Sequence, residues 1–328
     1  MIIKEFFMNK NLMWAYLIHL SEHMWDDEFS PARGSYLSKM YTPNNNTDFK
    51  VWDEVIKYLA ECKYTTVLVD VGDAIKYESH PEISAPNAWD KDFIKKKLDE
   101  IRALGMTPIP KLNFSTGHDA WLKKYARMVS TPEYYQVCED TISEVCELFD
   151  SPELFHIGFD EERPYFLRNR EMVITRGDAL WWHDLNLIAK LCEKNGARPW
   201  VWSDYCWAKM DKFTQNMSRE VLQSNWFYGT FKDYTPEQIK TMPEQYLAIA
   251  AYEELDKHGF EQVPTSSTWE NEHNTRQTVA FGKDKLTKNL RGFMTAPWVF
   301  TTELSKYRLL DDATKLYFAR IEHYPETL

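Results

Sequence analysis

The sequence lacks the long apolar runs and the basic clusters that mark membrane-spanning and nucleic-acid-binding proteins. No run of about 18 consecutive apolar residues occurs, the length of a candidate transmembrane helix. The 39 Lys and Arg are outnumbered by 50 Asp and Glu, which gives a formal net charge of −11. The cations form no stripe that could neutralise a phosphate backbone. We therefore expect no membrane span and no nucleic-acid partner.

Cysteine is scarce and has no metal-binding pattern. The five cysteines are dispersed without CxxC spacing, which fits buried, reduced thiols better than a disulfide framework or a zinc site. We expect no metal or other cofactor, although Asp and His side chains at strand ends leave a metal site open. Residues 1–20 contain apolar stretches broken by Lys, Glu and Asn, without a small-residue cleavage site. We expect a cytoplasmic chain, and the alternative that a leader peptide has been removed stays open.

Aromatic residues, by contrast, are abundant. They make up 15% of the chain and include 13 Trp. Indole rings suit the apolar faces of sugars, but they also fill hydrophobic cores. Composition alone leaves both interpretations open.

Short β-rich apolar runs alternate about eight times with amphipathic helical stretches, which is typical of parallel α/β architecture. Helices are predicted at 91–104, 131–149 and 184–195. We find no repeat, low-complexity tract or long linker, so the sequence predicts a single-domain (β/α)8 barrel over residues 1–328. The predicted strands are 12–20, 65–70, 107–112, 154–159, 199–203, 220–226, 246–251 and 291–297.

Polar residues follow most of these strands, at the end of the barrel where active sites of this architecture lie. The sharpest signal is HIGFDEE at 156–162, where an apolar strand ends in three consecutive acids. At a turn, Asp160 and Glu161 can reach one pocket, where burial and mutual repulsion raise the pKa of one carboxyl group. A carboxylic acid that keeps its proton can protonate a glycosidic oxygen. A solvated acidic turn is the alternative interpretation.

HIGFDE resembles the HxGxDE signature of the family 20 glycoside hydrolases, the β-N-acetylhexosaminidases. More degenerate segments resemble that family in the same order and cover most of the chain. They are LIHLSEHM (17–24), LVDVGDAIKYESHPEI (68–83), MTPIPKLNFSTGHDAW (106–121), PWVWSD (199–204) and TAPWVF (295–300).

The resemblance implies a substrate-assisted retaining mechanism on β-linked N-acetylhexosaminides. Glu161 would be the general acid, and Asp160 would orient the 2-acetamido group that attacks the anomeric carbon. The other implied substrate-binding positions surround this pair. Trp202, Trp226 and Trp298 would form the walls around the sugar, and Tyr228 would donate its hydroxyl to the acetamido oxygen. Asp204, after the fifth strand, is a further substrate-binding position. His118 would support the acid together with Asp70 or Asp73, and the choice between these two aspartates stays open.

Two departures bear on the substrate. The family's first-strand Arg, which grips outer sugar hydroxyls, has no counterpart in Met13-Trp14-Ala15, and the acid after the eighth-strand Trp is Phe300 here, with Glu303 nearby. Two alternatives therefore stay open. One is a glycosidase of other specificity that pairs Glu161 with Asp204, Glu253 or Glu303, and the other is a catalytically silent glycan-binding barrel. The sugar, the linkage, exo or endo action and the oligomeric state also stay open.

Overall fold

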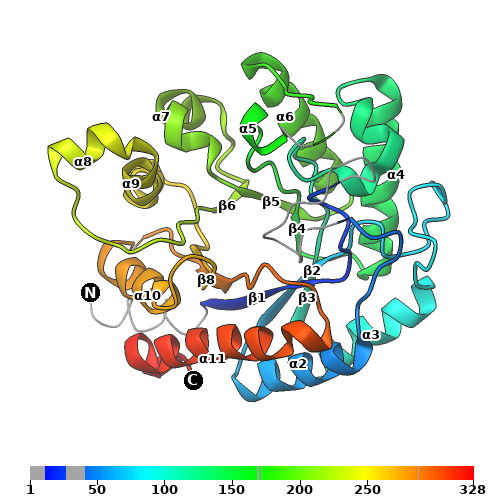
Figure 1. The fold of residues 1–328 in the computed structure, drawn as a ribbon, viewed down its shortest axis with the longest axis horizontal. Helices are drawn as coiled ribbons and strands as arrows, with labels where there is room; N and C mark the ends of the chain where they lie inside the picture. The colour runs from blue at the N-terminus through cyan, green and yellow to red at the C-terminus, as the bar shows by residue number, and fades with distance from the viewer. Residues whose placement is uncertain (1–11, 27–40, 168–169, 171, 287) are drawn as a thin grey trace.

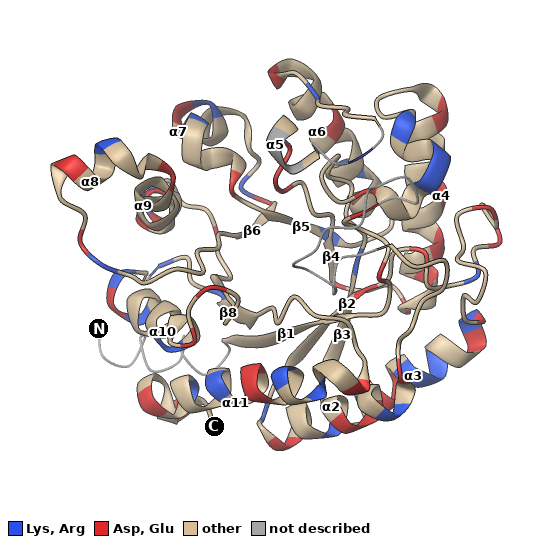
Figure 2. Ribbon diagram, viewed as in Figure 1, with Lys and Arg blue, Asp and Glu red and all other residues tan. Residues whose placement is uncertain are grey.

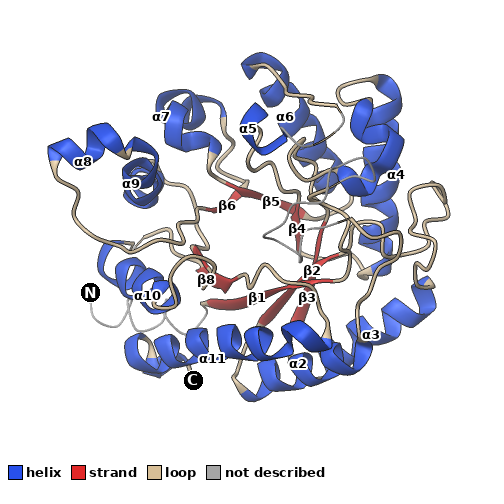
Figure 3. Cartoon of the chain, viewed as in Figure 1, coloured by secondary structure: helices blue, strands red, loops and turns tan. Residues whose placement is uncertain are grey.

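The computed structural model describes residues 12–26, 41–167, 170, 172–286 and 288–328. Eight parallel strands form a central sheet with the order β6-β5-β4-β3-β2-β1-β8-β7, and helices surround it (Figure 3). The strands are β1 (Met13–His19), β2 (Thr66–Asp70), β3 (Thr107–Lys111), β4 (Leu154–His156), β5 (Arg198–Trp202), β6 (Leu222–Ser224), β7 (Thr265–Ser266) and β8 (Gly292–Thr295).

The two ends of this strand order meet and close the ring. Isolated parallel bridges join Gln223 to Gln262 and Trp226 to Thr265. The backbone N–H of Thr265 donates to the carbonyl of Asn225 at 2.9 Å. The predicted (β/α)8 barrel is thus confirmed.

The helices lie outside the strands and cover the barrel (Figure 1). α4 illustrates how the sequence starts them, because Thr131 accepts a hydrogen bond from the N–H of Tyr134 and Pro132 occupies the first turn. The helices are α2 (Phe49–Glu61), α3 (Lys91–Ala103), α4 (Pro132–Leu148), α5 (Pro164–Leu167), α6 (Asp178–Lys194), α7 (Tyr205–Asn216), α8 (Pro236–Thr241), α9 (Pro243–Lys257), α10 (Asn274–Lys285) and α11 (Lys306–His323), with 3-10 turns η2 (Ala120–Arg127), η3 (Glu303–Ser305) and η4 (Pro325–Thr327).

Alternation along the strands divides the core into two parts. In β1, Trp14, Tyr16 and Ile18 belong to the layer between barrel and helices, whereas Ala15 and Leu17 face the barrel interior. All five cysteines are buried and free. Lys and Arg are interspersed with Asp and Glu over the outer helices (Figure 2). None of the helices in the described ranges is long and apolar enough to cross a membrane.

The seventh predicted strand is wrong. Residues 246–251 lie inside α9, and the seventh strand is instead the short β7. Pro243 opens α9, and its buried residues Ala248, Ala251, Tyr252 and Leu255 recur at helical spacing. Glu253 is therefore an exposed helix residue rather than one at the barrel mouth. The other seven predicted strands each overlap an observed one, and α6 begins at Asp178, before the predicted 184.

Candidate active site

A cavity of about 580 Å³ opens at the carboxyl ends of the strands. Its volume lies within the range of roughly 300–1,000 Å³ that encloses a drug-sized ligand. Seven of the predicted site residues line it, namely His118, Asp160, Glu161, Trp202, Trp226, Tyr228 and Trp298. The structure thus brings together the last residue of the fifth strand and residues that follow the third, fourth, sixth and eighth strands.

The backbone after β4 turns sharply. Gly158, Phe159 and Glu161 all have positive φ, at 77°, 71° and 55°. A Cβ at residue 158 would lie 1.8 Å from Oδ1 of Asn113, so only glycine fits there. A bulky residue such as Phe159 rarely adopts this conformation, and such strain concentrates at functional sites. The turn presents both Asp160 and Glu161 to the cavity.

His118 lies between these two acids. Its Nε2 is 3.2 Å from Oδ2 of Asp160 and 3.2 Å from Oε2 of Glu161. Burial alone would lower the pKa of His118, but the two carboxylates outweigh it and raise this pKa to about 9. Burial pushes the pKa of Asp160 upward, but the His118 cation and a 2.8 Å hydrogen bond from Asn113 hold it well below its usual value. Asp160 is therefore ionised at neutral pH, beside a protonated His118.

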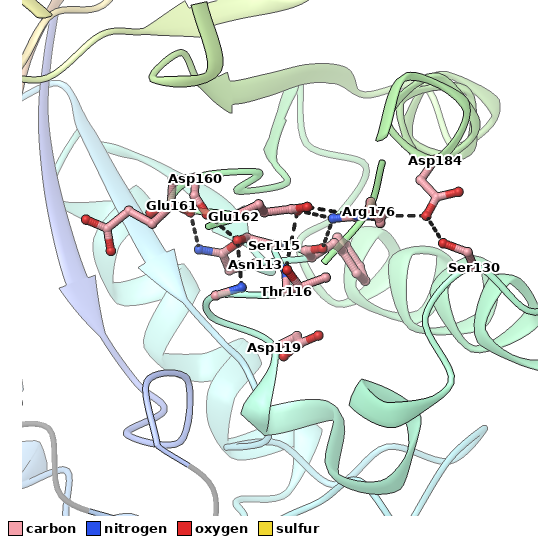
Figure 4. A network of polar contacts seen from close by, with 12 residues as sticks. Asn113, Ser115, Thr116, Asp119, Ser130, Asp160, Glu161, Glu162, Arg176 and Asp184 are labelled. Atoms are coloured by element: carbon pink, nitrogen blue, oxygen red, sulfur yellow. Dashed lines mark hydrogen bonds and ion pairs between the residues drawn. The ribbon is translucent and has the colours of Figure 1, made fainter. Parts of the chain in front are cut away.

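The third acid of the motif faces the other way. Figure 4 shows Glu162 pointing toward Arg176, while Glu161 points in the opposite direction. Arg176 forms an ion pair with Glu162 and lies 3.1 Å from Asp184, and it donates to the carbonyl of Phe114 at 2.9 Å. The Glu162 and Arg176 side chains are 4% and 1% exposed. Of the three consecutive acids, Glu162 is a buried structural residue.

Neither Asp70, the last residue of β2, nor Asp73, which follows it, contacts His118 among the described residues. Asp70 forms an ion pair with Lys111 and lies 3.4 Å from His19, so it sits at the barrel interior beneath the cavity. Asp73 lies 2.7 Å from Nδ1 of His23, in a separate buried cluster. Neither aspartate lines the cavity, so these contacts give no support to the expectation that one of them joins His118 in supporting Glu161.

Asp204 lies directly behind Glu161 rather than on the cavity wall. Its Oδ2 accepts the backbone N–H of Glu161 at 3.0 Å. Burial, and then the charge of Asp160, raise the pKa of Asp204. A role in contacting the substrate, as the sequence predicted, has no support in this position.

The predicted aromatic walls are present. Trp202 and Trp298 lie 5.8 Å apart between ring centres, and Trp226 stacks on Tyr228 at 5.0 Å. Trp298 has a φ of 52°, a further left-handed residue at the site. Flat apolar rings beside carboxylates suit a ligand with both apolar faces and hydroxyl groups.

The two positions at which the sequence departs from the family 20 pattern lie outside the cavity. Trp14 packs against Phe293 at 5.4 Å, outside the barrel interior. Phe300 packs against Trp25 at 5.7 Å, and the side chain of Glu303 is 72% exposed. None of Trp14, Phe300 and Glu303 lines the cavity.

The sequence analysis missed several lining residues. Trp25, Lys111, Trp269 and Glu270 all face the cavity. Lys111 carried a signal, because a lysine inside an otherwise apolar strand is rarely buried without a partner. Trp269 and Glu270 could not be found while the seventh strand was misplaced.

The described residues contain no group of three or more His, Cys, Asp or Glu side chains arranged to hold a metal ion. His19 and His23 have the four-residue spacing common in zinc sites, but each faces a different aspartate, Asp70 or Asp73.

No protein-family model matches the sequence, and the search among curated proteins finds no relative. Solved structures do resemble the fold. A structure of the pneumococcal virulence factor StrH matches with a TM-score of 0.61 at 12% identity, covering 97% of this chain and 86% of that one. Dispersin B matches with 0.58 at 14% identity, covering 95% and 99%.

A family 5 glycoside hydrolase from Prevotella bryantii, PbGH5A, matches with a TM-score of 0.53 at 11% identity, covering 96% of this chain and 97% of that one. At such identities the likeness concerns the fold. The chain has the (β/α)8 barrel fold found in glycoside hydrolases of families 20 and 5.

Proposed function

We propose that this chain is a glycoside hydrolase that acts on β-linked N-acetylhexosaminides by a substrate-assisted retaining mechanism. Glu161 is the general acid and base, and Asp160 orients the 2-acetamido group. The observation that carries the proposal is the placement of both acids at one aromatic cavity, each 3.2 Å from Nε2 of His118.

The electrostatics of Asp160 suit its assigned task. When the acetamido oxygen attacks the anomeric carbon, the amide nitrogen becomes more acidic and the oxazolinium ring gains positive charge. An ionised carboxylate placed there in advance stabilises that charge without reorganisation. Asp160 is buried, and its depressed pKa keeps it ionised.

The placement of Glu161 suits proton transfer. Its side chain is 24% exposed, more than the 10% of Asp160, and it lines the cavity. It can therefore reach a leaving-group oxygen while its neighbour contacts the acetamido group. After the first step, the same carboxylate accepts a proton from the water that opens the oxazolinium ion.

A comparison of matched substrates and variants tests this function. We expect release of the aryl group from aryl β-N-acetylglucosaminide or galactosaminide, and far slower release from the aryl β-glucoside, which lacks the acetamido nucleophile. Glu161→Gln and Asp160→Asn should each lower kcat by about 10²-fold or more. Full activity of Glu161→Gln, or equal rates on the glucoside, would contradict the proposal.

One observation favours a second candidate, a glycosidase that uses two protein carboxylates. Glu270 lines the cavity, and it makes no hydrogen bond or ion pair with another described residue. Glu270 is exposed, as are the earlier candidates Glu253 and Glu303, but unlike them it lines the cavity. In this mechanism Glu270 would be the nucleophile or base opposite Glu161. A thiazoline analogue of the oxazolinium ion separates the two, because only the acetamido-assisted mechanism predicts tight inhibition.

A glycan-binding barrel without turnover is the remaining outcome. Binding of glycans with no hydrolysis of any bound sugar would indicate it and would reject both enzymatic proposals.

A further inference from the structure

Asp204 occupies the N-cap position of α7 but does not cap that helix. An aspartate there ordinarily accepts a hydrogen bond from a backbone N–H in the first turn. The Asp204 side chain makes no such bond. Its Oδ2 accepts the N–H of Glu161 instead, at 3.0 Å. A helix-capping contact has thus been exchanged for a contact with the residue proposed as the general acid.

The peptide that Asp204 holds has an unfavourable conformation. Glu161 has a φ of 55°, in the left-handed region that few residues with side chains adopt. A strained conformation persists only where neighbouring contacts determine it. The backbone N–H of Glu161 is held by Asp204, and its carbonyl accepts the N–H of Arg163 two residues on, at 2.8 Å. Its carboxylate lies beside His118. Asp204 is therefore the side chain that holds this peptide from a neighbouring strand end. Glu161 is therefore fixed at both ends.

The charge state of Asp204 fits this role. The residue is 6% exposed, and its Oδ1 is buried without a hydrogen-bond partner among the described residues. The titratable and charged groups that act on it or respond to it are Asp160, Glu161, Arg163 and Cys206. Burial and the nearby carboxylates raise its pKa. A neutral Asp204 can accept the N–H of Glu161 without adding a third negative charge beside Asp160 and Glu161.

We propose that Asp204 is a positioning residue, which fixes the Glu161 peptide so that the Glu161 carboxyl group faces His118 and the cavity. Asp204 itself does not line the cavity, and it acts through Glu161 rather than on the substrate. This inference rests on the proposed role of Glu161 and deepens it.

Two substitutions of similar size test the inference. Asp204→Asn keeps an acceptor oxygen and removes the titration, whereas Asp204→Leu removes the acceptor. We expect Asp204→Leu to lose about 10²-fold in kcat, the effect of a misplacement near 1 Å at a reacting group, with KM little changed. Asp204→Asn should retain most of the wild-type kcat. Its activity should also persist to higher pH than that of the wild type, because no buried acid ionises beside Asp160.

Thermal unfolding of both variants shows whether each one folds. If folded Asp204→Leu keeps the kcat of the wild type, or folded Asp204→Asn is as impaired as Asp204→Leu, the positioning role is rejected. The second result would instead indicate a catalytic carboxylate at Asp204.

Crystal structures keep this inference separate from the proposed function. If the wild type hydrolyses no N-acetylhexosaminide, the proposed function fails, but the geometry of Glu161 can still be compared in the two variants. We expect Glu161 to leave the left-handed region in Asp204→Leu and to stay there in Asp204→Asn. An unmoved Glu161 in Asp204→Leu would overturn the inference.

Discussion

Glu162 forms a buried ion pair with Arg176, whereas the acid immediately before it in the sequence faces the cavity. Adjacent residues of one motif thus have separate tasks. The Arg176 guanidinium also contacts Asp184 in α6 and the carbonyl of Phe114 after β3. Arg176 therefore connects the segment that carries Asp160 and Glu161 to α6 and to the loop after β3.

Removal of Glu162 should affect stability more than chemistry. Breaking a buried ion pair by deleting one partner costs about 3–5 kcal/mol, so we expect Glu162→Ala to lower the free energy of unfolding by roughly that amount. Glu161→Gln is the matched control, and it should stay within about 1 kcal/mol of the wild type because Glu161 is partly exposed. Urea unfolding of both variants measures the difference. Equal stabilities would show that the Arg176 pair contributes little.

Removal of the His118 cation should change the pH dependence of activity. His118 and Asp160 attract each other, so His118→Asn should raise the pKa of Asp160 by about 1–3 units, the usual effect of a close opposite charge. Asp160 must be ionised to act, and the acid limb of kcat/KM should therefore move to higher pH in the variant. A pH profile on an aryl N-acetylhexosaminide measures this shift. An unmoved acid limb would mean that Asp160 does not control it.

Asp204 should make the fold less stable as pH rises. Its pKa is raised on folding, so between its ordinary pKa, about 4, and its raised value the native state binds more protons than the unfolded state. Stability then falls with increasing pH over that window. We expect Asp204→Asn to remove this loss and to be more stable than the wild type near pH 7, by about 1 kcal/mol or more, since one pKa unit is worth about that much. The gain should vanish as pH falls toward 4, and a gain independent of pH would contradict the assignment.

Glu270 separates the two enzymatic proposals. In the acetamido-assisted mechanism it can only bind sugar hydroxyls, so Glu270→Gln should raise KM by roughly tenfold, the weight of one charge-assisted hydrogen bond. In the two-carboxylate mechanism the same change should lower kcat on the order of 10⁴-fold, as loss of a catalytic residue does in other hydrolases. Glu272→Gln is the control, because Glu272 is 73% exposed and outside the cavity. Steady-state kinetics of both variants decide between the mechanisms.

The sequence predicted the parts of the fold and site that depend on local pattern. Strands such as β1 and β2 are apolar runs followed by polar residues, and the HIGFDE segment predicts a strand that ends in a turn with two acids. β7 was missed because it is two polar residues long, Thr265–Ser266, while the apolar run at 246–251 belongs to a helix. Periodicity cannot separate a short buried strand from one face of a helix.

The contact partners of the site residues could not be predicted from the sequence for a different reason. The Asp204 contact with Glu161 and the Arg176 pair with Glu162 depend on loop paths between elements, 43 and 14 residues apart in sequence. The contacts of Asp70 and Asp73, which were expected beside Glu161 together with His118, were equally hard to predict. Asp70 pairs with Lys111 and Asp73 with His23.

The central claim is that Asp160 stabilises a cation formed from the substrate's own acetamido group. Titration of an N-acetylglucosamine thiazoline against the wild type and Asp160→Asn tests it most directly. The account predicts tight binding to the wild type, at least 10²-fold tighter than N-acetylglucosamine itself as expected for a transition-state analogue, and loss of most of that advantage in Asp160→Asn. Equal affinities of the thiazoline for both proteins, or no preference over the plain sugar, would contradict it.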